Sequence, residues 1–255
     1  MTAPDLSVHT PFSTRPRVRP QWRRALRGLR RLLRDPERTE NAFEVIAALD
    51  PDLMQRRLAR MLSHPEGRRV FRERPCLLEH LADREGLARL PEGSFGRAYL
   101  AHVEHFGLDP AKLVELGRRY DDELHARDED VRWFGDRSLL SHDLHHVLTG
   151  YGADSLGETA LLWFSHGLVG GRGAALLMVG AALRSRREAG RGWLRYLAQA
   201  HRRGGRAGCL AALPWEELLE RPLPEVRRLA GIAEPEVAHP DGVRAGATAL
   251  PRAEP

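Results

Sequence analysis

Residues 141–150 read SHDLHHVLTG and close a longer helical pattern that covers Asp128 to Thr149. Leucine and valine recur in it at the three- and four-residue spacing of a single helix face. The positions concerned are Leu140, Leu144, Val147 and Leu148. Gly150 follows directly, at a position where helices commonly end. We therefore predict a helix with one face in a protein core.

Similar patterns occupy most of the remaining chain. They cover about 21–34, 40–63, a short stretch after Pro65, 93–106, 110–124, 155–168, 173–187, 192–203 and 215–229. No stretch alternates convincingly with the two-residue period of a half-buried strand, and β-branched residues are scarce. A chain of 255 residues can bury one sizeable core. The fold class we predict is all-α, a single-domain helical bundle.

The two ends of the chain differ from this middle part. The first residues are rich in Pro, Thr, Ser and Arg, and the last in Glu, Pro, Ala and Gly, so we expect a disordered N-terminal arm and C-terminal tail. Between arm and domain, 21–34 predicts an amphipathic helix with an apolar stripe and six arginines. Such a helix suits an anionic membrane surface, or else docks on the domain by its leucines. The expected organisation is 1–34 basic arm and helix, 35–232 helical domain, and 233–255 tail.

Composition excludes several classes of protein. The net charge is +5, but the basic residues are nearly all arginine, a bias typical of a GC-rich genome, so we predict no nucleic-acid partner. The first residues lack the charged start and apolar stretch of a secretory signal. The longest apolar run, 173–183, is too short to cross a bilayer. We expect a protein that does not span a membrane by itself.

Two histidines and two carboxylates are spaced so that they could share one ion. On a helix His142 and His146 lie one above the other, and Asp143 lies about 100° round from His142. Two glycines then turn the chain, which brings Glu158, in the first turn of the next helix, back toward the first helix. A set of two nitrogens and two oxygens suits zinc, Fe(II), Mn(II) or Co(II). The pattern predicts a divalent-metal site.

Plainer interpretations of the same residues stay open. The sequence from Ser155 to Glu158 also matches a capping box, in which the glutamate only satisfies a backbone N–H. His142 and His146 lie roughly opposite the predicted core face, which would leave them on the surface. The apolar residues 161–164 of the next helix favour instead a covered histidine side.

Beyond this cluster, several ordered motifs resemble the coenzyme Q (ubiquinone) biosynthesis protein four family. The family pattern is H-D-x-x-H followed twelve residues later by the Glu of a Gly-Glu pair, and His142, Asp143, His146 and Glu158 match it position for position. Further segments that resemble the family are 63–68 (SHPEGR), 90–99 (LPEGSFGRAY), 163–164 (WF) and 215–223 (WEELLERPL). The likeness covers roughly Asp35 to Ile232.

The resemblance implies a helical lyase that acts late in ubiquinone biosynthesis. Its activity would be the metal-dependent oxidative decarboxylation of a polyprenylated para-hydroxybenzoate-type intermediate, in which a hydroxyl replaces the ring carboxylate. It implies zinc or another divalent metal, held by His142, Asp143, His146 and Glu158. By analogy with carboxylates beside metals, Asp143 is our candidate for catalytic proton transfer.

The resemblance also implies partners and a location. The partners would be the polyprenylated aromatic substrate, other ubiquinone-biosynthesis enzymes and a membrane surface, and a homodimer stays open. We expect the cytoplasm of a bacterium, peripheral to the inner membrane. A lipid-tailed substrate needs an apolar groove, which 167–183 could line, although core packing is the plainer interpretation of these residues.

Two other functions stay open. In a non-catalytic scaffold of a ubiquinone-biosynthesis complex, the ion would only tie two helices together, with no open coordination position. A metal-dependent phosphohydrolase of the His-Asp type would need a further upstream histidine, for which His102, His105 and His125 are candidates. The match at Glu158 and the flanking motifs argue against the phosphohydrolase. A metalloprotease is weaker still, because Asp143 stands where the catalytic glutamate would be.

Overall fold

The computed structural model describes residues 19–35, 40–124, 129–189 and 192–233. This part of the chain forms fourteen α-helices and one 3-10 helix, with no β-strand apart from an isolated bridge between Ser94 and Pro222. The predicted all-α fold is confirmed. The predicted N-terminal arm and C-terminal tail fall almost wholly outside the described residues.

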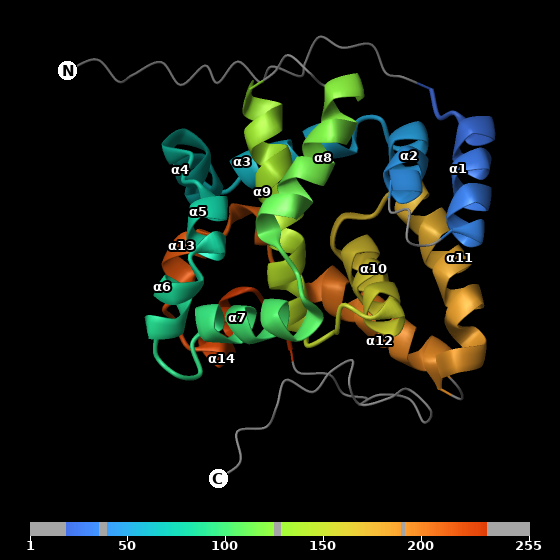
Figure 1. The fold of residues 1–255 in the computed structure, drawn as a ribbon. Coiled ribbons are helices and arrows are strands. Elements are labelled where there is room, and N and C mark those ends of the chain that lie inside the picture. The colour runs from blue at the N-terminus through green and yellow to red at the C-terminus, as the bar shows by residue number, and fades with distance from the viewer. Residues whose placement is uncertain (1–18, 36–39, 125–128, 190–191, 234–255) are drawn as a thin grey trace.

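The helices follow one another with short connections (Figure 1). In chain order they are α1 (Trp22–Arg34), α2 (Glu40–Leu49), α3 (Leu53–Leu62), α4 (Pro65–Glu73), α5 (Leu77–Ala82), α6 (Arg84–Arg89), α7 (Phe95–Phe106), α8 (Pro110–Leu124), α9 (Glu129–Thr149), α10 (Ser155–Val169), α11 (Arg172–Ala189), α12 (Trp193–Arg206), η1 (Leu210–Ala212), α13 (Trp215–Leu218) and α14 (Leu223–Leu229).

Two of the predicted helices are each divided in the structure. The pattern over 40–63 forms α2 and α3, because Pro51 disfavours a helical conformation at the preceding residue and has no N–H to donate. The pattern over 215–229 forms α13 and α14, separated at Pro222 for the same reason. The short helices α5 and α6 were not predicted. The single-helix predictions for these two stretches were wrong.

Helix α9 lies in the middle of the molecule (Figure 1). Helices α4 to α6 and α13 lie on one side of it, and α1, α2 and α10 to α12 lie on the other. The predicted apolar face of α9 is buried in the main core, with Leu144 and Leu148 fully inaccessible to solvent. This confirms the orientation of α9 that the sequence predicted.

Helices α10 and α12 pack with their backbones in contact. A Cβ atom added at Gly204 of α12 would lie only 1.9 Å from the carbonyl oxygen of Phe164 in α10. Any larger residue would therefore push the two helices apart. This close packing fixes α10, whose first turn carries Glu158.

Helix α1 is docked on α2 but keeps an exposed apolar edge. Ala25 is buried against α2, while Arg24 and Arg31 pair with Glu44. The side of α1 away from α2 exposes large apolar residues, namely Trp22, Leu26 and Leu33. One face of α1 thus docks on the domain through α2, and its exposed apolar face remains accessible for contact with another surface. Among the described residues, no helix is long and apolar enough to cross a membrane.

Candidate metal centre

Three ligand-type side chains converge where α9 ends and α10 begins. The Nε2 atoms of His142 and His146, one helical turn apart on α9, lie 3.2 Å from each other. Glu158 of α10 faces both rings: its Oε2 lies 3.4 Å from Nε2 of His142, and its Oε1 lies 3.2 Å from Nε2 of His146. Within the described ranges, these three side chains form the one group of this kind whose donor atoms could hold a metal ion.

The spacing of these donors fits a divalent ion. Two nitrogens that each lie 2.0–2.1 Å from one tetrahedral ion are about 3.3 Å apart, close to the distance between the two histidines. A carboxylate completes a borderline nitrogen and oxygen donor set, which does not select among zinc, Fe(II), Mn(II) and Co(II). The residues present therefore fit the predicted ion.

A backbone hydrogen bond orients His146. Its Nδ1 lies 3.0 Å from the carbonyl oxygen of Tyr151, to which only a protonated Nδ1 can donate. Nε2 then keeps its lone pair and points it at the cluster, as in metal-binding histidines whose other nitrogen is held by an outer partner. The turn that follows α9 thus sets the orientation of the ligand.

The cluster is closed on one side and open on the other. The side chain of His146 is 0% exposed, whereas those of His142 and Glu158 are 44% and 46% exposed. The interpretation that both histidines lie on the protein surface is therefore wrong for His146, which is buried, and correct only in part for His142. An open side gives a substrate access to the donors, which a purely structural metal site does not need.

The three side chains also shift each other's protonation. Burial raises the pKa of Glu158, but the charge of His142, and the hydrogen bonds that His142 and His146 donate when no metal is bound and their rings are protonated, outweigh it and hold that pKa well below its usual range. For His142, burial lowers the pKa, and the carboxylate of Glu158 more than restores it, so the net shift is upward. Glu158 consequently presents a negative charge to the cluster at neutral pH.

The structure does not bring Asp143 into this group. Its side chain is buried on α9, and its oxygens are not among the converging donor atoms. Burial raises the pKa of Asp143, while His142 and His146 partly offset that rise. Its predicted roles, as fourth ligand and in proton transfer, stay predictions.

The capping-box interpretation of Glu158 is wrong. Asp154, not Ser155, caps α10: its Oδ1 accepts hydrogen bonds from the backbone N–H groups of Leu156 and Gly157, at 2.9 and 3.1 Å. Because Asp154 is the N-cap, Glu158 lies one residue beyond the position that a capping box requires, and its own N–H is already bonded to the backbone oxygen of Asp154 at 2.8 Å. Its carboxylate faces the histidines instead.

Gly157 allows the first turn of α10 to approach the preceding loop. A Cβ atom at this position would lie 1.9 Å from the carbonyl oxygen of Gly152. A backbone contact of this kind excludes every residue but glycine without a shift of the helix. Gly157 therefore helps to set the distance from Glu158 to α9.

Two arginines that sequence reasoning missed hold the end of α9. The buried guanidinium of Arg203 donates to the carbonyl oxygen of Thr149 at 3.2 Å and to the hydroxyl of Tyr151 at 2.7 Å. Arg227 donates to the carbonyl oxygen of Leu148 at 2.9 Å. Both act on carbonyls left without partners at a helix end. An arginine-rich chain gives no signal for these contacts, which join residues more than fifty positions apart.

His102 of α7 also lies beside the cluster. Its ring stacks on that of His146, with 5.4 Å between the ring centroids. Its Nε2 is buried and has no hydrogen-bond partner among the described residues. His102 therefore covers the closed side of the cluster, but it is not one of the converging donors.

His145, on the neighbouring face of α9, should make stability depend on pH. Burial, reinforced by the charges of His142 and Arg57, lowers the pKa of His145 to about 3. Because this lies below the unfolded value of about 6.5, the neutral folded form is favoured above pH 6.5 and loses ground as the pH falls. Between pH 7.5 and 5 this one histidine should remove about 2 kcal/mol from the free energy of unfolding.

Urea unfolding of metal-free wild type and a His145→Gln variant at both pH values measures this effect. The variant should lose about 2 kcal/mol less than the wild type over the interval. Equal losses in the two proteins would show that His145 titrates normally in the folded state.

The fold and the cluster together define a class, the all-helical proteins with a two-histidine, one-carboxylate donor set at the junction of consecutive helices. Comparison with known proteins gives the family. The family profile described as "Coenzyme Q (ubiquinone) biosynthesis protein Coq4" matches residues 26–236, and the chain belongs to this family. The resemblance stated from the motifs is thereby confirmed.

Curated relatives carry the same family name. The mitochondrial COQ4 homolog of Danio rerio is 32% identical over 185 residues, which are 70% of this chain and 64% of that protein. Mitochondrial COQ4 of Scheffersomyces stipitis is 30% identical over 203 residues, 78% of this chain and 61% of that protein. The chain thus spans less than two thirds of the length of these two relatives. The relatives named here are eukaryotic, and a bacterial host stays a prediction.

A solved structure shares the fold. The crystal structure of a protein from Nostoc punctiforme, provisionally assigned to ubiquinone biosynthesis, superposes with a TM-score of 0.58. The match covers 83% of this chain and 98% of the other, at 20% sequence identity. At this identity the likeness concerns the fold alone.

Proposed function

We propose that this protein is a metal-dependent lyase of ubiquinone biosynthesis, which decarboxylates a polyprenylated para-hydroxybenzoate-type intermediate oxidatively. The observation that carries the proposal is the convergence of His142, His146 and Glu158 in a chain of the Coq4 family. Membership in the family supports the pathway, and the donor set supports the chemistry. The open side of the cluster favours this function over a scaffold that uses the ion only to join two helices.

The proposed reaction exchanges one ring substituent for another. The carboxyl group leaves as carbon dioxide, and a hydroxyl group takes its place on the same ring carbon. The substrate gives up two electrons in this exchange. We take dioxygen as the acceptor, which becomes hydrogen peroxide, and water as the source of the hydroxyl group. When bound, a divalent ion would polarise a substrate oxygen.

The residues of the chain have distinct roles in this proposal. His142, His146 and Glu158 would hold the ion, with Asp143 as the fourth ligand that the family pattern implies. His146 is already oriented by the carbonyl of Tyr151. The buried carboxylate of Asp143, whose pKa is raised, is suited to accept and return a proton close to the reacting carbon.

The activity is tested with a substrate analogue labelled at its carboxyl carbon. Purified protein loaded with zinc, or separately with Fe(II), should release labelled carbon dioxide and form the ring-hydroxylated product in the presence of dioxygen. A Glu158→Gln variant should lose the activity, since it removes the charge that faces both histidines.

A matched substitution controls this test. Glu217→Gln removes a carboxylate that pairs with Arg69 on the surface and should leave the rate unchanged. No carbon dioxide from any metal-loaded form, together with restored ubiquinone synthesis in cells lacking their own homologue, would contradict the lyase and support the scaffold.

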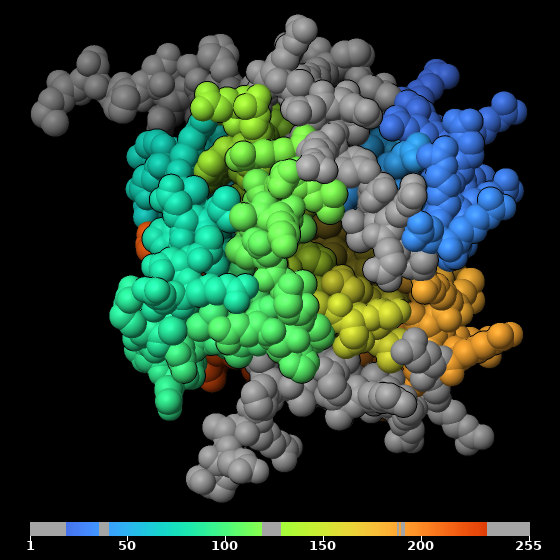
Figure 2. Space-filling model, in the orientation of Figure 1, coloured from blue at the N-terminus to red at the C-terminus, as the bar shows by residue number. Residues whose placement is uncertain are grey.

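We also propose that the chain works at a membrane surface beside other ubiquinone-biosynthesis enzymes. The exposed apolar edge of α1 belongs to an arginine-rich helix. Helix α1 lies beside α11 at the surface (Figure 2). A Cβ atom added at Gly180 of α11 would lie 3.3 Å from the side chain of Leu29 of α1, so the two helices are close at this point. The neighbouring Val179 and Leu183 of α11 are exposed. Apolar residues with a basic surround suit the interface of an anionic bilayer.

Vesicle flotation checks the membrane proposal. A Leu26→Glu, Leu33→Glu variant should bind vesicles of anionic phospholipid at least about 10-fold more weakly than the wild type, because it puts two charges into the apolar edge. Leu229→Glu changes an equally exposed leucine on α14 and should bind like the wild type. Equal binding by all three proteins would rule out α1 as the membrane-facing element.

A further inference from the structure

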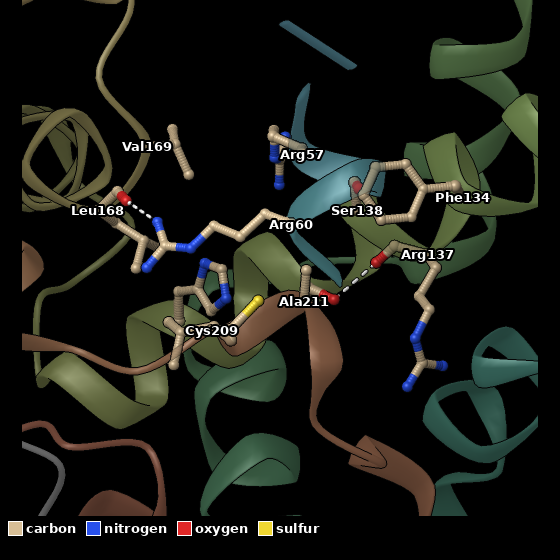
Figure 3. Close-up of a pocket in the computed structure, with 12 residues that line it drawn as sticks. Arg57, Arg60, Phe134, Arg137, Ser138, Leu168, Val169, Cys209 and Ala211 are labelled. Carbon is tan, nitrogen blue, oxygen red and sulfur yellow. Dashed lines mark hydrogen bonds between the residues drawn. The ribbon is translucent and has the colours of Figure 1, made fainter. Parts of the chain in front are cut away.

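A pocket lies beside the histidine cluster, on the neighbouring face of α9. Its walls come from α3, α9, the end of α10 and η1 (Figure 3). The space inside it is small, about 30 Å³, and its mouth is open to solvent. Three arginines and one histidine line it, namely Arg57, Arg60, Arg137 and His145, and no acidic residue among those that the structure describes does so.

Arg57 carries the unbalanced charge of this pocket. In the part of the chain that the structure describes, its guanidinium has no ion pair and no hydrogen bond. It lies over the ring of Phe134, 6.0 Å from the ring centroid. Burial lowers its pKa from the ordinary value. Arg57 is partly buried. Even partial withdrawal of a guanidinium from water without a counter-ion is costly, and an anion from outside would reduce that cost.

The other two arginines are already engaged. Arg137 pairs with Glu216 at 2.5 Å, and in Figure 3 its guanidinium points away from Leu168 and Val169. Arg60 reaches across the pocket and donates to the carbonyl oxygen of Leu168 at 2.6 Å, which leaves its other N–H groups available. The free cation is therefore Arg57, and Arg60 can assist it.

The remaining walls supply one polar group and an apolar lining. Nε2 of His145 is buried without a hydrogen-bond partner among the described residues. Phe134, Leu168 and Val169 give the pocket its apolar lining, with Phe134 on the side opposite Leu168 and Val169 (Figure 3). Of the residues expected to form an apolar groove, Leu168 and Val169 thus border this pocket, while Leu177 is buried against α1 and α2.

We infer that this pocket binds an oxyanion, a carboxylate or a phosphate on an apolar body, with Arg57 as its counter-ion. Arg60 would donate to the second oxygen, and His145 would complete the hydrogen bonding. A guanidinium matches the planar, two-oxygen face of either group. The inference rests on the pocket alone and holds whether or not the histidine cluster binds a metal.

Calorimetric titration of the metal-free full chain tests this inference. The probes are 4-hydroxybenzoate, inorganic phosphate and 4-hydroxybenzyl alcohol, which resembles the first probe but has no charge. At least one of the two anions should bind, and the alcohol should bind at least about 10-fold more weakly, the loss expected for one charge-assisted hydrogen bond. Binding of the benzoate alone identifies a carboxylate site, and binding of phosphate alone a phosphate site.

Variants separate the pocket from general charge effects. Arg57→Gln should weaken anion binding at least about 10-fold, and Arg57→Lys should restore part of it. Arg56→Gln makes the same charge change at the next position, where the arginine is exposed and pairs with Asp52, and should bind like the wild type.

The His146→Ala variant distinguishes the pocket from the histidine cluster. It removes a proposed metal ligand but should leave anion binding unchanged. Two outcomes would overturn the inference: no binding of either anion to folded wild type, or equal weakening by Arg57→Gln and Arg56→Gln.

Discussion

A His146→Ala variant is expected to bind Zn²⁺ more than about 100-fold more weakly than the wild type, since removal of a mere outer partner of a ligand already costs 10–100-fold. His146 is the only fully buried member of the cluster, and its Nε2 lies within 3.2 Å of both other ligand side chains. Competition against a chromophoric chelator at pH 7.5 measures the affinity.

His166→Ala is the matched control for this change. His166 is a half-buried histidine of α10 that pairs with His201, outside the cluster, so its loss should leave zinc affinity within about 2-fold of wild type, an ordinary variation for a distant site. If both variants lose affinity alike, the histidines bind zinc nonspecifically and the cluster is not the site.

The largest loss of stability is expected from Arg203→Gln. The change removes a buried guanidinium and leaves the carbonyl of Thr149 and the hydroxyl of Tyr151 without their donor. The lost hydrogen bonds from a charged donor and the buried acceptors left without a partner should together lower the free energy of unfolding by about 3 kcal/mol. Urea unfolding of the metal-free protein should show a loss of that size.

The neighbouring Arg202 provides the comparison. It is exposed on α12, so Arg202→Gln should change the free energy of unfolding by no more than about 0.5 kcal/mol. Comparable losses in the two variants would mean that Arg203 acts through the net charge of α12 and not through its contacts with the end of α9.

Local spacing was enough to predict the two histidines of the cluster. Residues four apart share a helix face whatever the tertiary structure, so His142 and His146 had to meet if the stretch was helical. Glu158 followed from a short connection between two helices. The position of the Asp143 side chain could not be predicted equally well. Asp143 lies about 100° round the helix from His142, and from there its side chain can turn toward the ion or toward the core.

Two features of the structure could not be predicted from the sequence: which of two adjacent residues caps α10, and which contacts form between helices that are far apart in the chain. Asp154 and Ser155 are both good caps, and only the observed backbone shows that the aspartate caps α10. The contacts of Arg203 with α9 and the unpaired charge of Arg57 depend on helices far apart in the chain. In a sequence with so many arginines, nothing distinguished these two beforehand.

We propose that His142, His146 and Glu158 together hold one divalent ion. The most direct measurement is metal content by mass spectrometry of protein purified without metal-affinity resin, beside a His142→Ala, His146→Ala double variant. We predict about one ion per chain in the wild type, the occupancy of a single shared site, and none in the folded double variant. A folded wild type without metal, or a double variant that keeps its ion, would contradict the claim.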